Sequence, residues 1–106
     1  MSIELTDADS GTTRSVRVGE RATVRLPENP TTGYRWQAEF DEAALRIVED
    51  RYDGPESPRG AGGHRVLTVE PLRAGTTRLR LANRRSWGDG DPIAEFVVDL
   101  GADVDD

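Results

Sequence analysis

The sequence contains no cysteine, no lysine and a single histidine, and only 6% of its residues are aromatic. Without cysteine the chain cannot form a disulfide, a thiolate metal site or a cysteine nucleophile. Long apolar runs are also missing, and none approaches the ~20 residues that a membrane-spanning helix needs. Residues 1–7 lack the basic and apolar regions of a signal peptide. We therefore expect a cytoplasmic location, or a secreted or periplasmic one if a longer form carries a leader.

Acidic residues outnumber basic ones by 20 to 14, which gives a formal net charge of -6 at pH 7. Binding to nucleic acid needs clustered positive charge, so this balance argues against a nucleic-acid partner. The length of 106 residues suits one domain. We expect a single domain over residues 1–106, with residues 101–106 as a frayed acidic tail, and neither a nucleic-acid nor a membrane partner.

Apolar and polar residues alternate along most of the chain, as is typical of half-buried antiparallel strands. Breaks rich in glycine and proline separate the runs at a spacing of roughly 8–12 residues, which is typical of a sandwich or a barrel. Residues 41–45 could instead begin a short helical turn. The pattern predicts an all-β, antiparallel fold with strands over residues 13–18, 22–26, 34–38, 45–48, 66–69, 77–81 and 93–100. The predicted core consists of Val16, Val24, Trp36, Ile47, Val69, Leu79, Leu81, Phe96 and Val98.

Catalytic signatures are weak. The single histidine, His64, has Gly63 and Arg65 as neighbours and no recognisable nucleophile–base context. The acidic residues form no pair with a distinctive setting for hydrolysis. We expect a protein that is not an enzyme and that needs neither a cofactor nor a metal.

Residues 29–34, Asn-Pro-Thr-Thr-Gly-Tyr, form the most informative break between predicted strands. Pro30 fixes its own φ and favours an extended Asn29. Thr31 and Thr32 are stiff because they are β-branched, and Gly33 permits a positive φ at the start of the next strand. The residues predict a rigid projecting loop, although an ordinary turn has a similar composition.

Two further breaks stand out. Residues 60–63, Gly-Ala-Gly-Gly, leave the backbone uncovered, so another chain could pair with it; the alternative is a flexible connector. Residues 85–87, Arg-Ser-Trp, place a tryptophan beside an arginine between two strands. That combination is typical of a binding hot spot, although the tryptophan could also fold back on the edge of a sheet.

In this order the three motifs resemble the chagasin family of cysteine peptidase inhibitors. Members carry an N-P-T-T-G-Y/F motif, a G-x-G-G motif and an R-P-W/F motif. The first is complete at residues 29–34 and the second at residues 60–63. The third keeps Arg85 and Trp87 but has Ser86 where the family usually has proline. Since Ser86 leaves one φ unfixed, we expect a modest loss of affinity.

The resemblance implies an immunoglobulin-like β-sandwich whose three motif loops lie side by side at one end. It also implies reversible, non-covalent inhibition of papain-like cysteine peptidases by closing the active-site cleft. Thr31 and Thr32 would enter the catalytic centre, with the second and third loops on either side. We expect one monomer to bind one papain-like peptidase. The implied protease-binding residues are Asn29, Pro30, Thr31, Thr32, Gly33, Tyr34, Gly60, Ala61, Gly62, Gly63, Arg85 and Trp87.

The alternative function is a non-inhibitory β-sandwich binding module for a glycan or a protein ligand. Exposed Tyr34 and Trp87 could stack on sugar rings. A shared fold does not decide between these functions.

Overall fold

The computed structural model describes residues 2–29, 33–54, 63–85 and 91–104. Most of these residues lie in strands, which confirms the all-β prediction. A single 3-10 helix, η1 (Asp7–Asp9), occurs within the described ranges. The strands are β1 (Ser2–Thr6), β2 (Thr12–Arg17), β3 (Arg21–Glu28), β4 (Tyr34–Glu39), β5 (Leu45–Asp53), β6 (Gly63–Pro71), β7 (Gly75–Arg85) and β8 (Ala94–Asp103).

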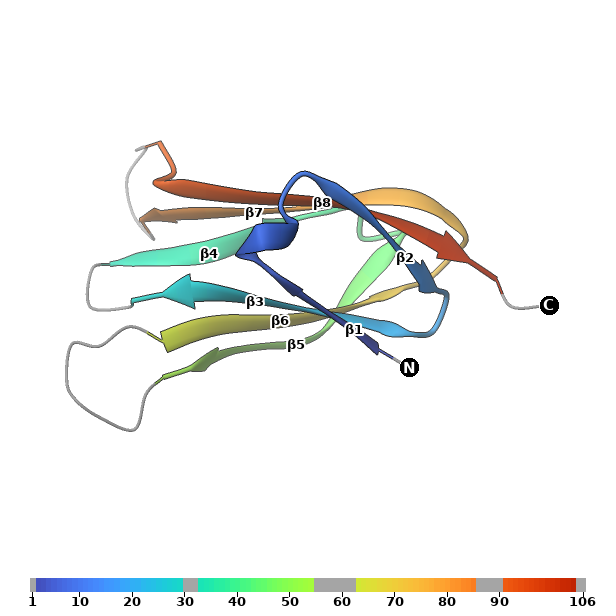
Figure 1. The fold of residues 1–106 in the computed structure, drawn as a ribbon, viewed down its shortest axis with the longest axis horizontal. Helices are drawn as coiled ribbons and strands as arrows, with labels where there is room; N and C mark the ends of the chain where they lie inside the picture. Colours follow the sequence, from blue (N-terminus) through green and yellow to red (C-terminus); the bar gives the residue numbers. More distant parts are fainter. Residues whose placement is uncertain (1, 30–32, 55–62, 86–90, 105–106) are drawn as a thin grey trace.

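The strands form two four-stranded sheets that pack face to face, in the orders β1-β3-β6-β5 and β2-β8-β7-β4 (Figure 1). Four of the strand pairings are antiparallel, whereas β1 pairs with β3 and β2 with β8 in parallel. Parallel neighbours need a crossover connection, and β2 in the opposite sheet supplies it between β1 and β3. The fold is the expected sandwich, with a parallel pair at one edge of each sheet.

The core lies between the sheets and follows the alternation of the strands. Ala22, Val24 and Leu26 of β3 are all buried, and Leu79 and Leu81 of β7 are buried in the opposite sheet. Seven of the nine predicted core residues are buried: Val16, Val24, Val69, Leu79, Leu81, Phe96 and Val98. Trp36 is partly buried and packs against the core.

The prediction for Ile47 is wrong, because this side chain is 40% exposed. Its register partner Val69 is fully buried, but Ile47 lies on the edge strand β5, which has a neighbour on one side only. A bulge between Ile47 and Glu49 also shifts the alternation there. Leu45 is the fully buried side chain at the start of this strand.

Three other segments refine the sequence prediction. β1 was not predicted, yet Leu5 near its end is fully buried. The tail was predicted to fray from residue 101, but β8 continues to Asp103 because Gly101 and Ala102 pair with β2 and β7. Residues 41–45 form a single turn in which the carbonyl of Asp41 accepts the N–H groups of Ala44 and Leu45.

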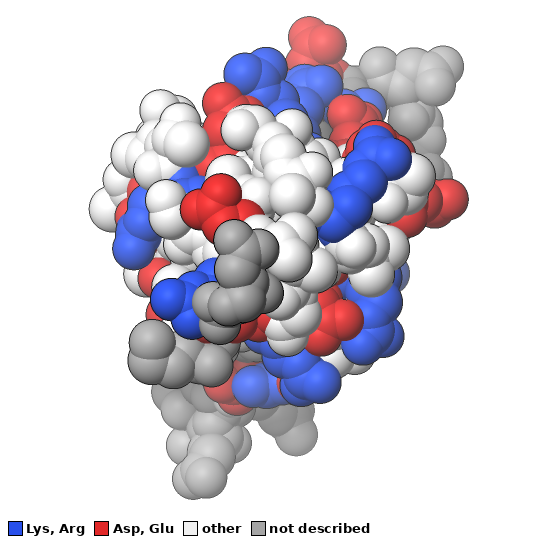
Figure 2. Space-filling model, turned by 90° about the vertical axis from the view of Figure 1, so that its right-hand side faces the viewer, with Lys and Arg blue, Asp and Glu red and all other residues white. Residues whose placement is uncertain are grey.

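Six strand ends gather at one end of the sandwich, on the left of Figure 1. They are the end of β3 and start of β4, the end of β5 and start of β6, and the end of β7 and start of β8; we call these pairs the first, second and third stems. Each stem flanks one of the three motifs. Figure 2 shows the opposite end of the molecule, where acidic and basic side chains are interspersed rather than gathered by sign.

Candidate functional site

The first stem is fixed by Gly33 and Trp36. Gly33 has a φ of 81°, the left-handed conformation that the sequence predicted at this position. Both N–H groups of Trp36 reach back to the end of β3. The indole Nε1 donates to the carbonyl of Pro27 at 2.8 Å, and the backbone nitrogen donates to Oε1 of Glu28 at 2.8 Å. The two strands of this stem belong to different sheets, so these bonds also join the sheets.

The second stem is closed by close packing around Gly63. A Cβ atom added to Gly63 would lie 2.4 Å from the carbonyl oxygen of Asp53, 2.6 Å from Cα of Gly54 and 2.7 Å from the hydroxyl of Tyr52. A Cβ atom on Gly54 would lie 2.7 Å from the ring of Tyr52. The last glycine of the second motif is therefore required by space, because the facing backbone occupies the position of a side chain.

The third stem contacts the first. Tyr34 and Arg85 are register partners in β4 and β7, and Cζ of Arg85 lies 5.4 Å from the centre of the Tyr34 ring. This is a cation–π distance. On β8's side of the stem, the N–H of Ile93 donates to the carbonyl of Asn83 at 2.8 Å, and the Ile93 side chain is 60% exposed. Arg85 is thus held against the first stem, and Ile93 offers an apolar surface beside it.

The three stems surround a hollow of about 360 Å³. Each contributes two or more lining residues: Asn29 and Tyr34 from the first stem, Gly63 and His64 from the second, and Asn83 and Ile93 from the third. Glu28 is the register partner of Gly63, and Tyr34 is the register partner of Arg85. These pairings place the stems side by side at the end of the sandwich. Segments that are more than 50 residues apart in the chain, at Asn29 and Asn83, therefore border one site.

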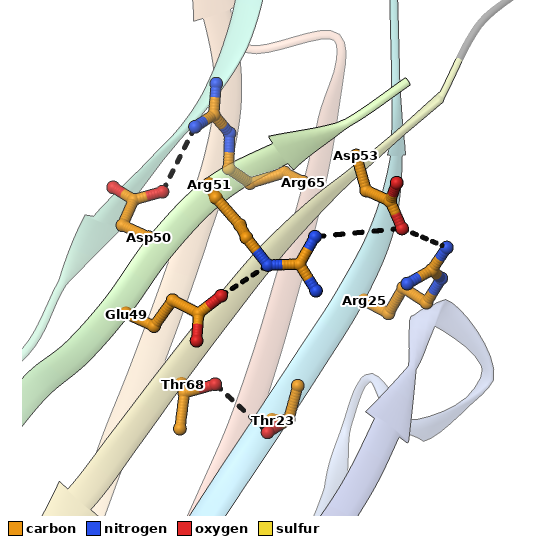
Figure 3. Close-up of polar contacts among 8 residues, drawn as sticks. All are labelled: Thr23, Arg25, Glu49, Asp50, Arg51, Asp53, Arg65 and Thr68. Carbon is orange, nitrogen blue, oxygen red and sulfur yellow. Dashed lines mark hydrogen bonds and ion pairs between the residues drawn. The ribbon is translucent and has the colours of Figure 1, made fainter. Parts of the chain in front are cut away.

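The outer face of the second stem carries a network of charges and hydroxyl groups (Figure 3). Asp53, the last residue of β5, pairs with Arg25 of β3 at 2.9 Å and with Arg51 at 3.7 Å, and Arg51 also pairs with Glu49. The hydrogen bond from Arg25 lowers the pKa of Asp53 below its ordinary value. Farther from the stems, Thr23 of β3 and Thr68 of β6 share a hydrogen bond of 3.0 Å. Exposed ion pairs are individually weak, but this set links β3 and β5 across the intervening β6.

The structure describes five of the twelve predicted site residues and places them all at the stem end of the molecule: Asn29, Gly33, Tyr34, Gly63 and Arg85. The other seven lie outside the described residues: Pro30, Thr31, Thr32, Gly60, Ala61, Gly62 and Trp87. Ser86 also lies outside them.

Sequence reasoning missed Glu28, Arg65, Asn83 and Ile93. For Glu28 a signal was present, since it continues the inward alternation of Ala22, Val24 and Leu26. No comparable signal exists for Arg65, because β6 is buried on both faces and its pattern does not show which residues point inward.

Within the described ranges, no three histidine, aspartate or glutamate side chains gather as they would around a metal ion. No helix in that part of the chain is long and apolar enough to cross a membrane.

Comparison with known proteins decides the family. Residues 15–100 match the chagasin family of peptidase inhibitors, I42. The chain is 37% identical to chagasin from Trypanosoma cruzi over 109 aligned positions, which cover 96% of this chain and 99% of that protein. The chain belongs to the chagasin family. Accordingly it is a cysteine peptidase inhibitor and not an enzyme.

Solved structures share the fold of this chagasin-family protein. The crystal structure of the cysteine protease inhibitor EhICP2 from Entamoeba histolytica superposes with a TM-score of 0.89 at 24% identity, over 96% of each chain. PbICP-C, solved in complex with falcipain-2, superposes with a TM-score of 0.62 at 14% identity, over 98% of each chain. The immunoglobulin-like sandwich expected from the motifs is confirmed by these likenesses and by the strand order.

Proposed function

We propose that this protein inhibits papain-like cysteine peptidases reversibly and without a covalent bond, by closing the active-site cleft with its three motif segments. The observation that carries the proposal is the convergence of the three stems at one end of the sandwich, in a chain of the chagasin family. The twelve residues named from the motifs are the proposed contacts. The chain has no cysteine, so it offers no thiol for a mixed disulfide with the enzyme.

Fixed stems support tight binding for a physical reason. Ordering a mobile side chain at an interface costs about 0.5–1.5 kcal/mol, so segments that are held in place before binding avoid part of that cost. The bonds from Trp36, the packing at Gly63 and the Arg85–Tyr34 contact each restrain one stem. An interface of standard size, about 1,600 Å² in total, is then sufficient for nanomolar affinity.

The choice of a papain-like partner is supported by the shared fold with PbICP-C, whose structure was solved in complex with falcipain-2. One copy of the chain brings all three stems together, so a monomer suffices for the proposed binding. The proposed interaction joins two protein surfaces, so it requires neither a cofactor nor a metal.

Titration of papain, followed by a cathepsin L-type enzyme, tests the proposal. We expect stoichiometric loss of peptidase activity at nanomolar protein, with recovery of activity on dilution and an intact inhibitor on a gel. If several papain-like enzymes keep their activity at micromolar protein, the proposal is wrong. A glycan array and a pull-down with Trp87→Ala as control would then test the binding-module alternative.

A further inference from the structure

Buried and exposed residues alternate along strand β3, and Glu28 occupies a buried position of this pattern where an apolar residue would be expected. Ala22, Val24 and Leu26 point into the core and are buried, and Glu28 is the next residue in that series. The side chain of Glu28 has no exposed surface. An ionised carboxylate is costly to bury unless it is paired and hydrogen-bonded, so its partners show what the residue does.

Both oxygens of Glu28 are bonded, and they reach into both sheets. Oε2 accepts a hydrogen bond from Nε of Arg65 in β6 at 3.1 Å and forms an ion pair with Nη2 of the same side chain at 2.8 Å. Oε1 accepts the backbone N–H of Trp36 of β4 at 2.8 Å. One carboxylate therefore joins the end of β3 to the neighbouring strand β6 in the same sheet and to the third residue of β4 in the opposite sheet.

Arg65 extends the connection to the second stem. It lies two residues after Gly63, its side chain is only 11% exposed, and its Nη1 pairs with Asp50 of β5 at 3.1 Å (Figure 3). Burial opposes the charge of this guanidinium, but the bonds to Glu28 and Asp50 outweigh that effect and raise the pKa of Arg65. The arginine stays charged and bridges β3 and β5 from its place on β6.

We propose that Glu28 is a positioning residue of the inhibitor: through Arg65 and Trp36 it fixes the first and second stems relative to each other before a peptidase binds. The proposal rests on the function proposed above. It assigns this role to a buried residue outside the three motifs. Glu28 and Arg65 together hold β4, β5 and β6 at the level where the motif segments begin.

The test is the dissociation rate of the complex with papain, measured for wild-type protein and for Glu28→Gln. The amide keeps the size of the side chain and an acceptor for Trp36, but it turns N–H groups toward the donors of Arg65. Loosened stems should shorten the life of the complex while leaving diffusional encounter unaltered, so we expect dissociation to be about tenfold faster and association to change little. Mass spectrometry after long incubation should show cleavage within residues 29–34 of the variant and none in wild type.

Two controls separate positioning from general loss of stability. Leu100→Ala removes a fully buried side chain near the far end of β8, so it destabilises the fold without touching the stems. Its dissociation rate should match that of wild type even though its unfolding midpoint falls. The double variant Glu28→Gln/Arg65→Gln should dissociate no faster than the worse of Glu28→Gln and Arg65→Gln, because either substitution alone already breaks the Glu28–Arg65 contact that joins the stems.

The possible failures are distinguishable. An unchanged dissociation rate for Glu28→Gln, an equal acceleration in Leu100→Ala, or additive effects in the double variant would each overturn the positioning role. If wild-type protein itself does not inhibit papain, the proposed function fails first, and the comparison of variants does not arise.

Discussion

Replacing Gly63 by alanine is a direct perturbation of the second stem. The new Cβ would lie 2.4 Å from the carbonyl oxygen of Asp53 and 2.6 Å from Cα of Gly54, and Cβ atoms essentially never approach other atoms within 3.0 Å. Both neighbours are backbone atoms, one in the last residue of β5 and one in the residue after it, so the strain cannot be relieved by turning a side chain. Strands β5 and β6 would have to separate at the neck of their hairpin.

Overpacking that moves backbone typically costs about 1–3 kcal/mol. In a domain of this size each kcal/mol lowers the melting temperature by about 4–8 °C, so we expect a fall of about 10 °C for Gly63→Ala. Thermal denaturation followed by circular dichroism measures this directly. Inhibition of papain should also weaken, because the displaced strand ends lead into the second motif.

Gly101→Ala is the matched control. Gly101 also lies in a strand, but the nearest atoms to an added Cβ are 3.9 and 4.0 Å away, which is ordinary contact. This variant should melt within a few degrees of wild type, or slightly higher because alanine restricts the unfolded chain. Equal melting temperatures for Gly63→Ala and wild type, or an equal fall in both variants, would refute the reasoning from close packing.

Three further predictions follow from the same end of the molecule. Gly33→Ala forces a side chain into a φ of 81°, which should cost about 1 kcal/mol in urea denaturation and weaken inhibition; unchanged stability would contradict the left-handed conformation. Ile93→Asp should leave the melting temperature nearly unchanged, since the side chain is 60% exposed, but should raise the inhibition constant for papain about tenfold; equal constants would place Ile93 outside the interface. Arg25 lowers the pKa of Asp53, so the stability that this carboxylate adds is present above its unfolded pKa and is lost as the pH falls through the lower native value. In the Asp53→Asn variant, the free energy of unfolding should therefore decrease less steeply below about pH 4 than in wild type. An identical decrease in both proteins would contradict the pairing.

The fold was predictable where one face of a strand is buried and the other is exposed to solvent. β3 and the middle of β7 show this alternation, and the core residues predicted there, Val24, Leu79 and Leu81, are buried. Ile47 misled because the sequence does not reveal that β5 is an edge strand with a bulge. β1 is too short and too polar to stand out, and it is a strand because β3 offers it a partner. Strand order is a tertiary property that alternation does not encode.

The residues by themselves indicated three separate segments, and only the resemblance to the chagasin family implied that these segments lie side by side. Gly33 could be assigned a positive φ from its type and place alone. The need for glycine at Gly63 depends on the opposite strand, which brings the carbonyl of Asp53 against it. Arg65 and Asn83 escaped notice for the same reason, because their roles depend on which neighbours the register supplies.

The inward-facing residues of the sandwich are apolar in the middle and become polar or charged toward the stems. Burying these polar groups does not by itself stabilise the fold. Apolar pairs fill the middle, whereas the stem end buries the Glu28–Arg65 ion pair and the amide of Asn83. Oδ1 of Asn83 is buried without a hydrogen-bond partner in the described part of the chain, an arrangement that costs free energy. Replacing a buried ion pair by apolar residues of similar volume is often neutral or stabilising, so stability alone does not favour these residues. Hydrogen bonds and ion pairs have a required geometry, whereas apolar contacts do not. A carboxylate on β3 that is bonded to both Trp36 of β4 and Arg65 of β6 therefore fixes how these three strands are arranged. A fixed arrangement of strands is the property that an inhibitor needs at the end proposed to contact its enzyme.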